Sequence, residues 1–129
     1  MPDRVLIDTS VWIDLLRTAR ATEKIEALLS ERRAAVCGLI VTELLRGAKG
    51  KKEVAVLGQL LDVVSYVHIA EEIYEQAGRL GSVMANRGFS IATVDLVIAQ
   101  TCITGGLTLF SYDTHFQQVA KYEKLRLVA

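Results

Sequence analysis

The sequence predicts an α/β domain in which a four- to five-stranded parallel sheet is flanked by helices on both faces. Short apolar runs rich in β-branched residues alternate along the chain with longer stretches that have helical periodicity. A crossover between parallel strands places a helix on a face of the sheet. The length of 129 residues corresponds to one domain.

Strands and helices alternate from the start of the chain. The apolar run Val5–Ile7 predicts the first strand, and Asp8-Thr9-Ser10 ends it with short polar side chains that suit a helix N-terminus. The pattern then predicts helices over 11–16 and 22–31, a strand over 34–37, a helix over 40–46 that Gly47 ends, and a helix over 52–61.

The second half begins with a predicted third strand over 63–67 and an amphipathic helix over 71–86. Apolar residues recur in this helix at spacings of 4, 3 and 4, namely at Ile73, Ala77, Leu80 and Met84. Gly78 and Gly81 inside it cost about 1 kcal/mol each relative to alanine. That cost predicts compensation by the close approach of another element.

A helix over 93–103 follows, capped by Thr93 and ended by Gly105-Gly106. It is apolar nearly all round, which predicts a central position in the domain. Strands are predicted over 108–110 and, as a fifth strand, over 125–128.

The composition excludes several classes of protein. Lys plus Arg and Asp plus Glu each number 15, so the formal net charge is zero, which excludes a uniformly basic nucleic-acid coat and an acidic disordered tail. Apolar residues make up 51% of the chain, which excludes intrinsic disorder. Because so short a chain has little interior, this share predicts an apolar face that a partner covers.

We expect a cytoplasmic protein. The residues after Met1 do not form the apolar core of a signal peptide, and the longest uncharged stretch, 96–112, holds too many polar residues and glycines for a membrane span. Cys37 and Cys102 lie in separate apolar runs without metal-type spacing, so we interpret them as buried, reduced thiols.

Four acidic residues fall at the edge of the predicted sheet where the strands end, which is where ligands bind in such folds. These are Asp8 after the first strand, Glu43 in the helix after the second, Asp95 in the first turn of the central helix, and Asp113 just past the fourth strand. Each also has a structural alternative. Asp8 and Asp113 suit helix caps, and Asp95 suits the positive end of a helix dipole. Glu43 suits an ion pair with Arg46.

The surroundings of two of these acids favour chemistry. Asp95 and Glu43 lie in apolar segments, and no Lys or Arg occurs within four residues of Asp95; an acid there is costly to bury unless it is paired or coordinated. Converging carboxylates repel one another, and a divalent cation relieves that repulsion. Oxygen ligands indicate Mg²⁺ or Mn²⁺, which activate water and stabilise charge on a phosphate. The acids are therefore predicted to support phosphodiester hydrolysis.

Four segments carry the acids in order along the chain: Val5–Trp12, Val41–Gly47, Asp95–Ala99 and Ser111–Phe116. They resemble the four motifs of the PIN-domain nucleases, and most closely those of the VapC-type toxins of toxin–antitoxin pairs. The resemblance covers essentially the whole chain. It implies a single PIN domain over residues 1–129 that acts as a Mg²⁺- or Mn²⁺-dependent endoribonuclease, forms a homodimer, and is neutralised by a small antitoxin bound in a groove near the active site.

The resemblance also assigns roles to the acids. Asp8, Asp95 and Asp113 match the residues that hold metal, directly or through water. Glu43 completes the acidic cluster by holding metal or positioning the attacking water.

Two hydroxyl residues match supporting positions of the family. Thr9 and Ser111 correspond to hydroxyls that steady the metal ligands or a phosphate. The fourth motif often has Asn or Thr where Ser111-Tyr112 stands, so the sequence departs from the family pattern at this point.

Several other residues have two interpretations each. Trp12 could line the antitoxin groove with Leu15 and Leu16, or it could pack in the core. His115 could contact a phosphate or the leaving group, or it could be a surface or core histidine. A basic group just beyond Glu43 could follow an RNA backbone or belong to a solvated loop; it consists of Arg46, Lys49, Lys51 and Lys52.

Two other functions also use acids at the edge of a parallel sheet. A receiver-type signalling domain binds Mg²⁺ there, but that design needs a Lys after a late strand, and no Lys occurs between Lys52 and Lys121. A catalytically silent module would keep the fold in order to bind a partner or nucleic acid. An RNA cleavage assay distinguishes the silent module from the nuclease.

Overall fold

The computed structural model describes residues 3–18, 20 and 22–128, so the predicted domain limits, residues 1 and 129, lie outside the described residues. Within the described ranges the strands are β1 (Val5–Ile7), β2 (Ala34–Cys37), β3 (Ser65–Val67), β4 (Thr108–Phe110) and β5 (Arg126–Leu127). The helices are α1 (Thr9–Arg17), α2 (Thr22–Ser30), α3 (Gly38–Gly47), α4 (Gly50–Val63), α5 (Glu71–Asn86), α6 (Thr93–Gly105) and α7 (Thr114–Tyr122).

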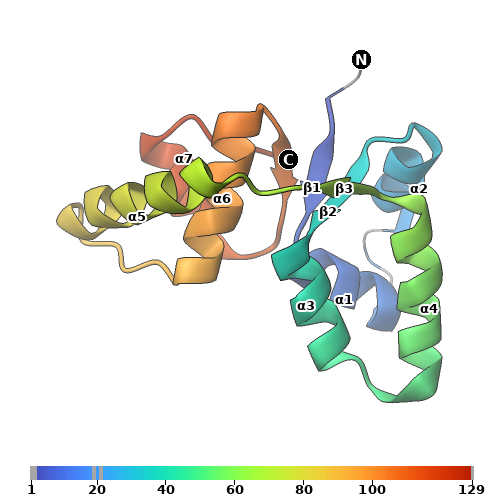
Figure 1. Ribbon diagram of the computed structural model, residues 1–129. Coiled ribbons are helices and arrows are strands. Elements are labelled where there is room, and N and C mark those ends of the chain that lie inside the picture. Colours follow the sequence, from blue (N-terminus) through green and yellow to red (C-terminus); the bar gives the residue numbers. More distant parts are fainter. Residues whose placement is uncertain (1–2, 19, 21, 129) are drawn as a thin grey trace.

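The five strands form one parallel sheet in the order β3-β2-β1-β4-β5. β1 is the central strand: its Leu6 pairs with Ala35 of β2 on one side and with Leu109 of β4 on the other. Helices α1–α4 lie to one side of the strands and α5–α7 to the other (Figure 1). The predicted architecture, a parallel sheet flanked by helices on both faces, is confirmed.

The middle of the sheet is buried on both faces, which explains its continuous apolar composition. Leu6, Ile7 and Leu109 are fully buried. The buried residues of α6 lie all around its axis, at Leu96, Val97, Ile98, Ala99, Thr101 and Cys102. A helix enclosed in this way needs no polar face, so the predicted central position of α6 is confirmed.

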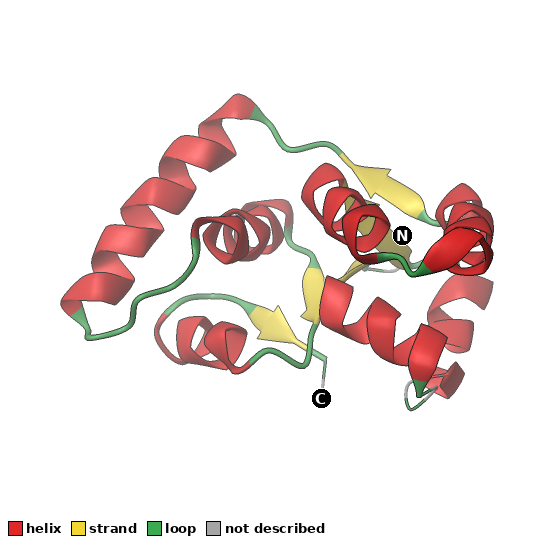
Figure 2. Cartoon of the chain, turned by 90° about the horizontal axis from the view of Figure 1, so that it is seen from below, coloured by secondary structure: helices red, strands yellow, loops and turns green. Residues whose placement is uncertain are grey.

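α5 packs on the outer side of α6, so that α6 lies between α5 and the sheet (Figure 2). The predicted apolar face of α5 is buried at Ile73, Ala77, Leu80 and Met84. A Cβ atom at Gly81 would lie 2.8 Å from Leu96 Cδ1, so the predicted close approach is confirmed there. It is wrong for Gly78, where a Cβ atom would meet no heavy atom within 4 Å.

Three local features differ from the prediction. α7 is not among the helices predicted from the sequence, although the interpretation of Asp113 as a helix cap agrees with it; Phe116 and Val119 form its buried face. β3 is shorter than predicted, since Val63 is still part of α4 and is exposed. Thr93 is the first residue of α6 rather than its cap; Ala92 occupies the cap position, and no side chain caps the helix.

Both cysteines are buried and free, as predicted. Burial raises the pKa of the Cys37 and Cys102 thiols, so both thiols are neutral at physiological pH. None of the helices in the described part of the chain combines the length and the apolar character that a membrane crossing requires.

Candidate functional site

The candidate site lies where β1 and β4 end. The chain runs from β1 through β2 to β3 and then returns to β4 on the other side of β1, so the direction of connection reverses between β1 and β4. In open parallel sheets the crevice beyond such a reversal binds ligands. The Asp8 N–H donates to the Phe110 carbonyl at 2.9 Å, which holds the two strand ends side by side.

Asp8 is a buried carboxylate, 6% exposed, that two hydroxyls hold. Ser111 Oγ donates to Asp8 Oδ2 at 2.8 Å, and Ser10 Oγ donates to the same oxygen at 3.1 Å. Asp8 occupies the cap position of α1, but its side chain makes no capping hydrogen bond. The helix-cap alternative therefore does not account for this acid.

The two serine hydroxyls also fix the loop that follows β4. Ser111 Oγ accepts from the Asp113 N–H at 3.0 Å, and Ser10 Oγ accepts from the Tyr112 N–H at 3.1 Å. Each hydroxyl thus accepts from the loop and donates to Asp8. Ser10 and Ser111 therefore join the ends of β1 and β4 through one network.

Glu43 lies half-buried on α3 and is tied to α1 by Thr9. Thr9 Oγ1 donates to Glu43 Oε1 at 3.0 Å, so the carboxylate is held toward the helix that begins after Asp8. Among the residues that the structure describes, Glu43 forms no ion pair with Arg46. The surface-pair alternative is therefore not realised.

Asp95, Asp113 and His115 come together at the start of α6 and α7. One potential ligand atom from each lies within 4.8 Å of the others. His115 Nδ1 is 3.5 Å from Asp95 Oδ2 and 3.4 Å from Asp113 Oδ1. Asp113 also caps α7, because its Oδ1 accepts from the His115 N–H at 2.9 Å. The helix-cap alternative is therefore confirmed for Asp113, but the cap leaves its carboxylate in the cluster.

The electrostatics of this cluster are unfavourable for negative charge. Burial raises the pKa of Asp95, the neighbouring His115 opposes the shift, and the charges of Asp113 and Asp8 raise the pKa further. His115 Nδ1 is a buried atom without a hydrogen-bond partner among the described residues. Two carboxylates and an unpartnered imidazole nitrogen thus face a common point.

Asp8 and Glu43 lie near the cluster but outside it. The charge of Asp8 acts on Asp95, and after burial the charges of Asp8 and Glu43 both contribute to the raised pKa of the Cys37 thiol. Neither acid belongs to the group of described residues whose ligand atoms lie within 4.8 Å of one another. The four acids therefore lie at one edge of the sheet. Asp95 and Asp113 belong to the cluster with His115, and Asp8 and Glu43 lie beside that cluster.

The sequence left two interpretations of His115 open, a contact with the phosphate or leaving group and a surface or core position. Its position two residues after Asp113 was the available signal, because that spacing puts it in the first turn of a helix that Asp113 caps. Trp12 is settled in favour of the core: it is buried, and its Nε1 donates to the Ile7 carbonyl at 2.9 Å.

The basic residues beyond Glu43 are all exposed at the turn between α3 and α4: Arg46, Lys49, Lys51 and Lys52. The Lys49 N–H donates to Glu53 Oε1 at 2.7 Å and so starts α4. The ammonium groups of this turn are therefore carried on an ordered helix end.

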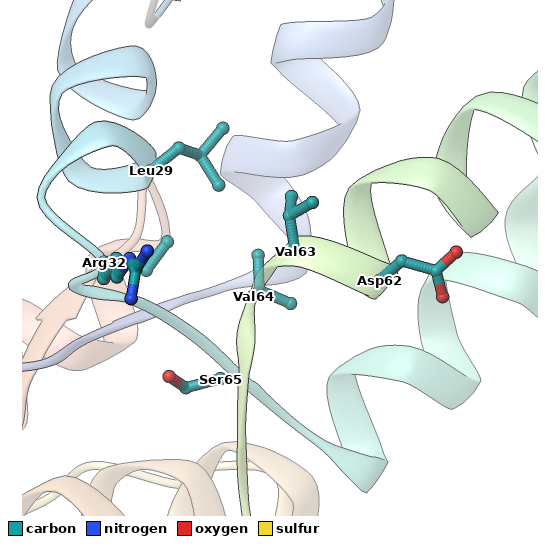
Figure 3. Close-up of a pocket in the computed structure, with 7 residues that line it drawn as sticks. Leu29, Arg32, Asp62, Val63, Val64 and Ser65 are labelled. Atoms are coloured by element: carbon teal, nitrogen blue, oxygen red, sulfur yellow. The ribbon is translucent and has the colours of Figure 1, made fainter.

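The opposite edge of the sheet is different in character. A hollow of about 350 Å³ lies beside the first residues of β2 and β3, Ala34 and Ser65. Leu29 and Val63 face each other across it, while Asp62 points away (Figure 3). No acidic cluster lines this hollow in the described part of the chain, so it is not the candidate site.

The fold and the site agree with a known family. A model of the PIN domain matches residues 5–122, and the chain therefore belongs to the PIN-domain family. Ribonuclease VapC11 of Mycobacterium tuberculosis is 27% identical over 128 residues, which cover 95% of this chain and 96% of that protein.

Solved structures show the same fold. The chain resembles VapBC2 from Rickettsia felis, solved bound to a DNA fragment from its promoter, with a TM-score of 0.82 and 18% identity over 96% of each chain. It also resembles DNA-bound VapBC from Salmonella typhimurium, with a TM-score of 0.81 and 16% identity over 98% of each chain.

Proposed function

We propose that this chain is a Mg²⁺-dependent endoribonuclease that acts as the toxin of a toxin–antitoxin pair in the cytoplasm. The observation that carries the proposal is the convergence of Asp95, Asp113 and His115 beside a carboxylate, Asp8, that two serine hydroxyls hold. Membership of the PIN-domain family and similarity to VapC ribonucleases over nearly the whole chain support it.

The residues at this edge fit a divalent cation. Burial raises the pKa of Asp95, and the charges of Asp113 and Asp8 raise it further, while His115 Nδ1 has no hydrogen-bond partner among the described residues. Carboxylate oxygens with one imidazole nitrogen suit Mn²⁺, and the oxygens alone suit Mg²⁺. We assign Asp8, Asp95 and Asp113 as the residues that hold the cation, which would activate water and stabilise charge on the phosphate.

The remaining side chains orient this set. Both serine bonds to Asp8 go to Oδ2, and they fix the direction of the carboxylate that would hold the cation. Thr9 holds Glu43, which is the carboxylate proposed to complete the cluster and position the attacking water. Such supporting hydrogen bonds fix the direction of the ligands and raise their affinity for metal.

A groove between α1 and α4 is the proposed seat of the antitoxin. It has a volume of about 490 Å³ and is lined by Leu15, Leu16, Lys52, Glu53, Val56 and Leu60. A lining of four apolar side chains with one lysine and one glutamate suits an amphipathic helix. The complex of VapBC-1 from Haemophilus influenzae and the toxin–antitoxin complex from Klebsiella pneumoniae are among the structures with this fold.

The surface also supports the other two proposed interactions. Tyr66 on the edge strand β3 and Tyr74 on α5 are exposed and border one hollow, which favours burial of this face in a homodimer. The exposed Lys49, Lys51 and Lys52 with Arg46 form the proposed path of the RNA backbone.

The test is an RNA cleavage assay with the purified protein. Cleavage of a structured RNA is expected with Mg²⁺ or Mn²⁺ and is expected to stop when EDTA is added. Asp8→Asn and Asp95→Asn should abolish cleavage and keep the circular dichroism spectrum of the wild type. Glu75→Gln is the matched control, since Glu75 pairs only with Arg79 on the exposed face of α5 among the described contacts. Full activity in either Asn variant would refute the assignment, and binding without cleavage by the wild type would favour a silent module.

A further inference from the structure

Arg20 and Tyr112 form a cation–π pair beside the candidate site. Arg20 Cζ lies 5.1 Å from the centroid of the Tyr112 ring, which is within the range of a cation–π contact. Arg20 lies between α1 and α2, and Tyr112 lies between β4 and α7. The contact therefore joins two loops that are far apart in the sequence.

A buried acid holds the guanidinium in place. Arg20 Nε donates to Asp14 Oδ1 at 2.7 Å, and Thr18 Oγ1 donates to the same oxygen. Asp14 is 6% exposed, whereas the Arg20 side chain is 70% exposed. The Asp14 bond thus holds the guanidinium on its protein side, while its other side is open to solvent. A ligand that stacks on the guanidinium therefore removes little further side-chain freedom from Arg20.

Tyr112 belongs to the loop that builds the site. It stands between Ser111, which holds Asp8, and Asp113, and its own N–H donates to Ser10 Oγ. Its ring is 40% exposed and packs edge-on against Phe110, with centroids 5.8 Å apart at 84°. The cation–π pair therefore borders the carboxylates, and its tyrosine ring is packed on one side against Phe110.

The ion pair indicates which part of a nucleotide this surface would bind. Asp14 balances the charge of Arg20, and in the described part of the chain no other acid pairs with it. A balanced guanidinium attracts phosphate weakly, but its plane still accepts a base. Unpaired RNA bases stack on aromatic rings and on arginine planes.

We propose that Arg20 and Tyr112 form a stacking platform for one unpaired RNA base next to the cleaved phosphodiester, with Asp14 as the residue that positions Arg20. The proposal rests on the proposed ribonuclease function. It assigns substrate contact to a tyrosine at which the chain departs from the family pattern and to an arginine that carries no sequence motif.

The experiment compares variants that separate the planar shape of the Arg20 guanidinium from its positive charge. KM and kcat are measured on a fluorescent single-stranded oligoribonucleotide of 12 or so bases, and Kd is measured for the same oligonucleotide without metal. Arg20→Met and Tyr112→Leu are expected to raise KM and Kd about tenfold, the scale of one stacked base, with kcat within twofold of the wild type. Arg20→Lys should raise KM and Kd as much as Arg20→Met does, because lysine keeps the positive charge but has no planar group. Tyr112→Phe should keep the wild-type KM.

The control is Arg79→Met, since the Arg79 side chain is 76% exposed and pairs with one acid, Glu75, at 2.6 Å. It should leave KM, Kd and the melting temperature unchanged. Wild-type affinity in Arg20→Lys would overturn the platform in favour of charge, and equal affinities in Arg20→Met and Arg79→Met would overturn any contact with RNA. The metal-free Kd values report on the platform even where the wild type fails to cleave, so failure of the ribonuclease proposal is recognised separately.

Discussion

Asp14 and Asp95 are two acids of one small domain whose pKa values are shifted in opposite directions by their surroundings. Asp14 is buried beside a hydroxyl and a cation: the Thr18 hydrogen bond lowers its pKa most, burial opposes this, and Arg20 lowers it further. Asp95 is half-buried beside other acids: burial raises its pKa, and Asp113 and Asp8 add to the shift, which the neighbouring His115 opposes. Asp14 is paired with a cation within the protein, although its Oδ2 is a buried atom without a hydrogen-bond partner among the described residues. Asp95 instead lies beside other acids, whose charges add to its raised pKa.

The largest expected difference between the two acids is in catalysis. Asp95→Asn is expected to lower kcat for RNA cleavage at least about 100-fold, since even residues that only orient a metal ligand contribute about 10- to 100-fold. Asp14→Asn is expected to lower the melting temperature by several degrees and to raise KM while kcat stays near the wild type. Steady-state kinetics with thermal melting of both variants checks this. Equal losses of kcat in Asp14→Asn and Asp95→Asn would contradict the different roles assigned to the two acids.

The hydroxyl that supports Asp8 is expected to have an intermediate effect. Ser111→Ala removes the bond to Asp8 Oδ2 and the acceptor of the Asp113 N–H, so activity at limiting Mg²⁺ should fall about tenfold and recover in part at high Mg²⁺. Ser82→Ala, on the exposed side of α5, is the control. Indistinguishable metal titrations of the two variants would argue against a supporting role for Ser111.

Metal binding should distinguish the two acids by stability. A ligand at 100 times its Kd stabilises the folded state by about 2.7 kcal/mol, so saturating Mn²⁺ is expected to raise the melting temperature of the wild type and of Asp14→Asn by several degrees. It should leave Asp95→Asn nearly unchanged. Differential scanning fluorimetry with Mn²⁺ and then EDTA makes the comparison. A rise in the melting temperature of Asp95→Asn equal to that of the wild type would contradict the assignment of Asp95 to the metal site.

The smallest effect is the pH dependence of stability without metal, and its sign differs between the two acids. The raised pKa of Asp95 in the folded state costs stability above that pKa, and the cost disappears as the pH falls toward the unfolded value near 4. Asp95→Asn should therefore be at least as stable as the wild type at pH 7, with the difference shrinking on acidification. The lowered pKa of Asp14 contributes stability above the unfolded value, and this is lost as the pH falls through the folded pKa.

Urea unfolding between pH 3 and pH 8 measures both dependences. Asp14→Asn should be less stable than the wild type at pH 7, and the gap should close below pH 4. Glu75→Gln, whose parent side chain is exposed, is expected to follow the wild type throughout. A wild type that is more stable than Asp95→Asn at pH 7 without metal would contradict the account of Asp95.

The sequence predicted those parts of the fold that depend on local pattern. The alternation that gives β1, β2 and β4, the apolar face of α5 and the enclosed α6 follow from which residues must be buried. α7 is absent from the predicted helices, although its apolar residues Phe116 and Val119 have helical spacing and Asp113 suits its cap. Gly78 and Gly81 look alike in the sequence, and only the packing of Leu96 against one of them tells them apart.

The sequence by itself determined that four acids would stand at one edge of a parallel sheet, because strand ends and helix starts are set by short-range preferences. Only the tertiary structure decided how they meet. The strand reversal between β1 and β4 brings Ser111 onto Asp8 across 103 positions of chain, and α7 turns His115 between Asp95 and Asp113. Such contacts depend on side-chain directions and on the order of strands, which the pattern of a single chain does not specify.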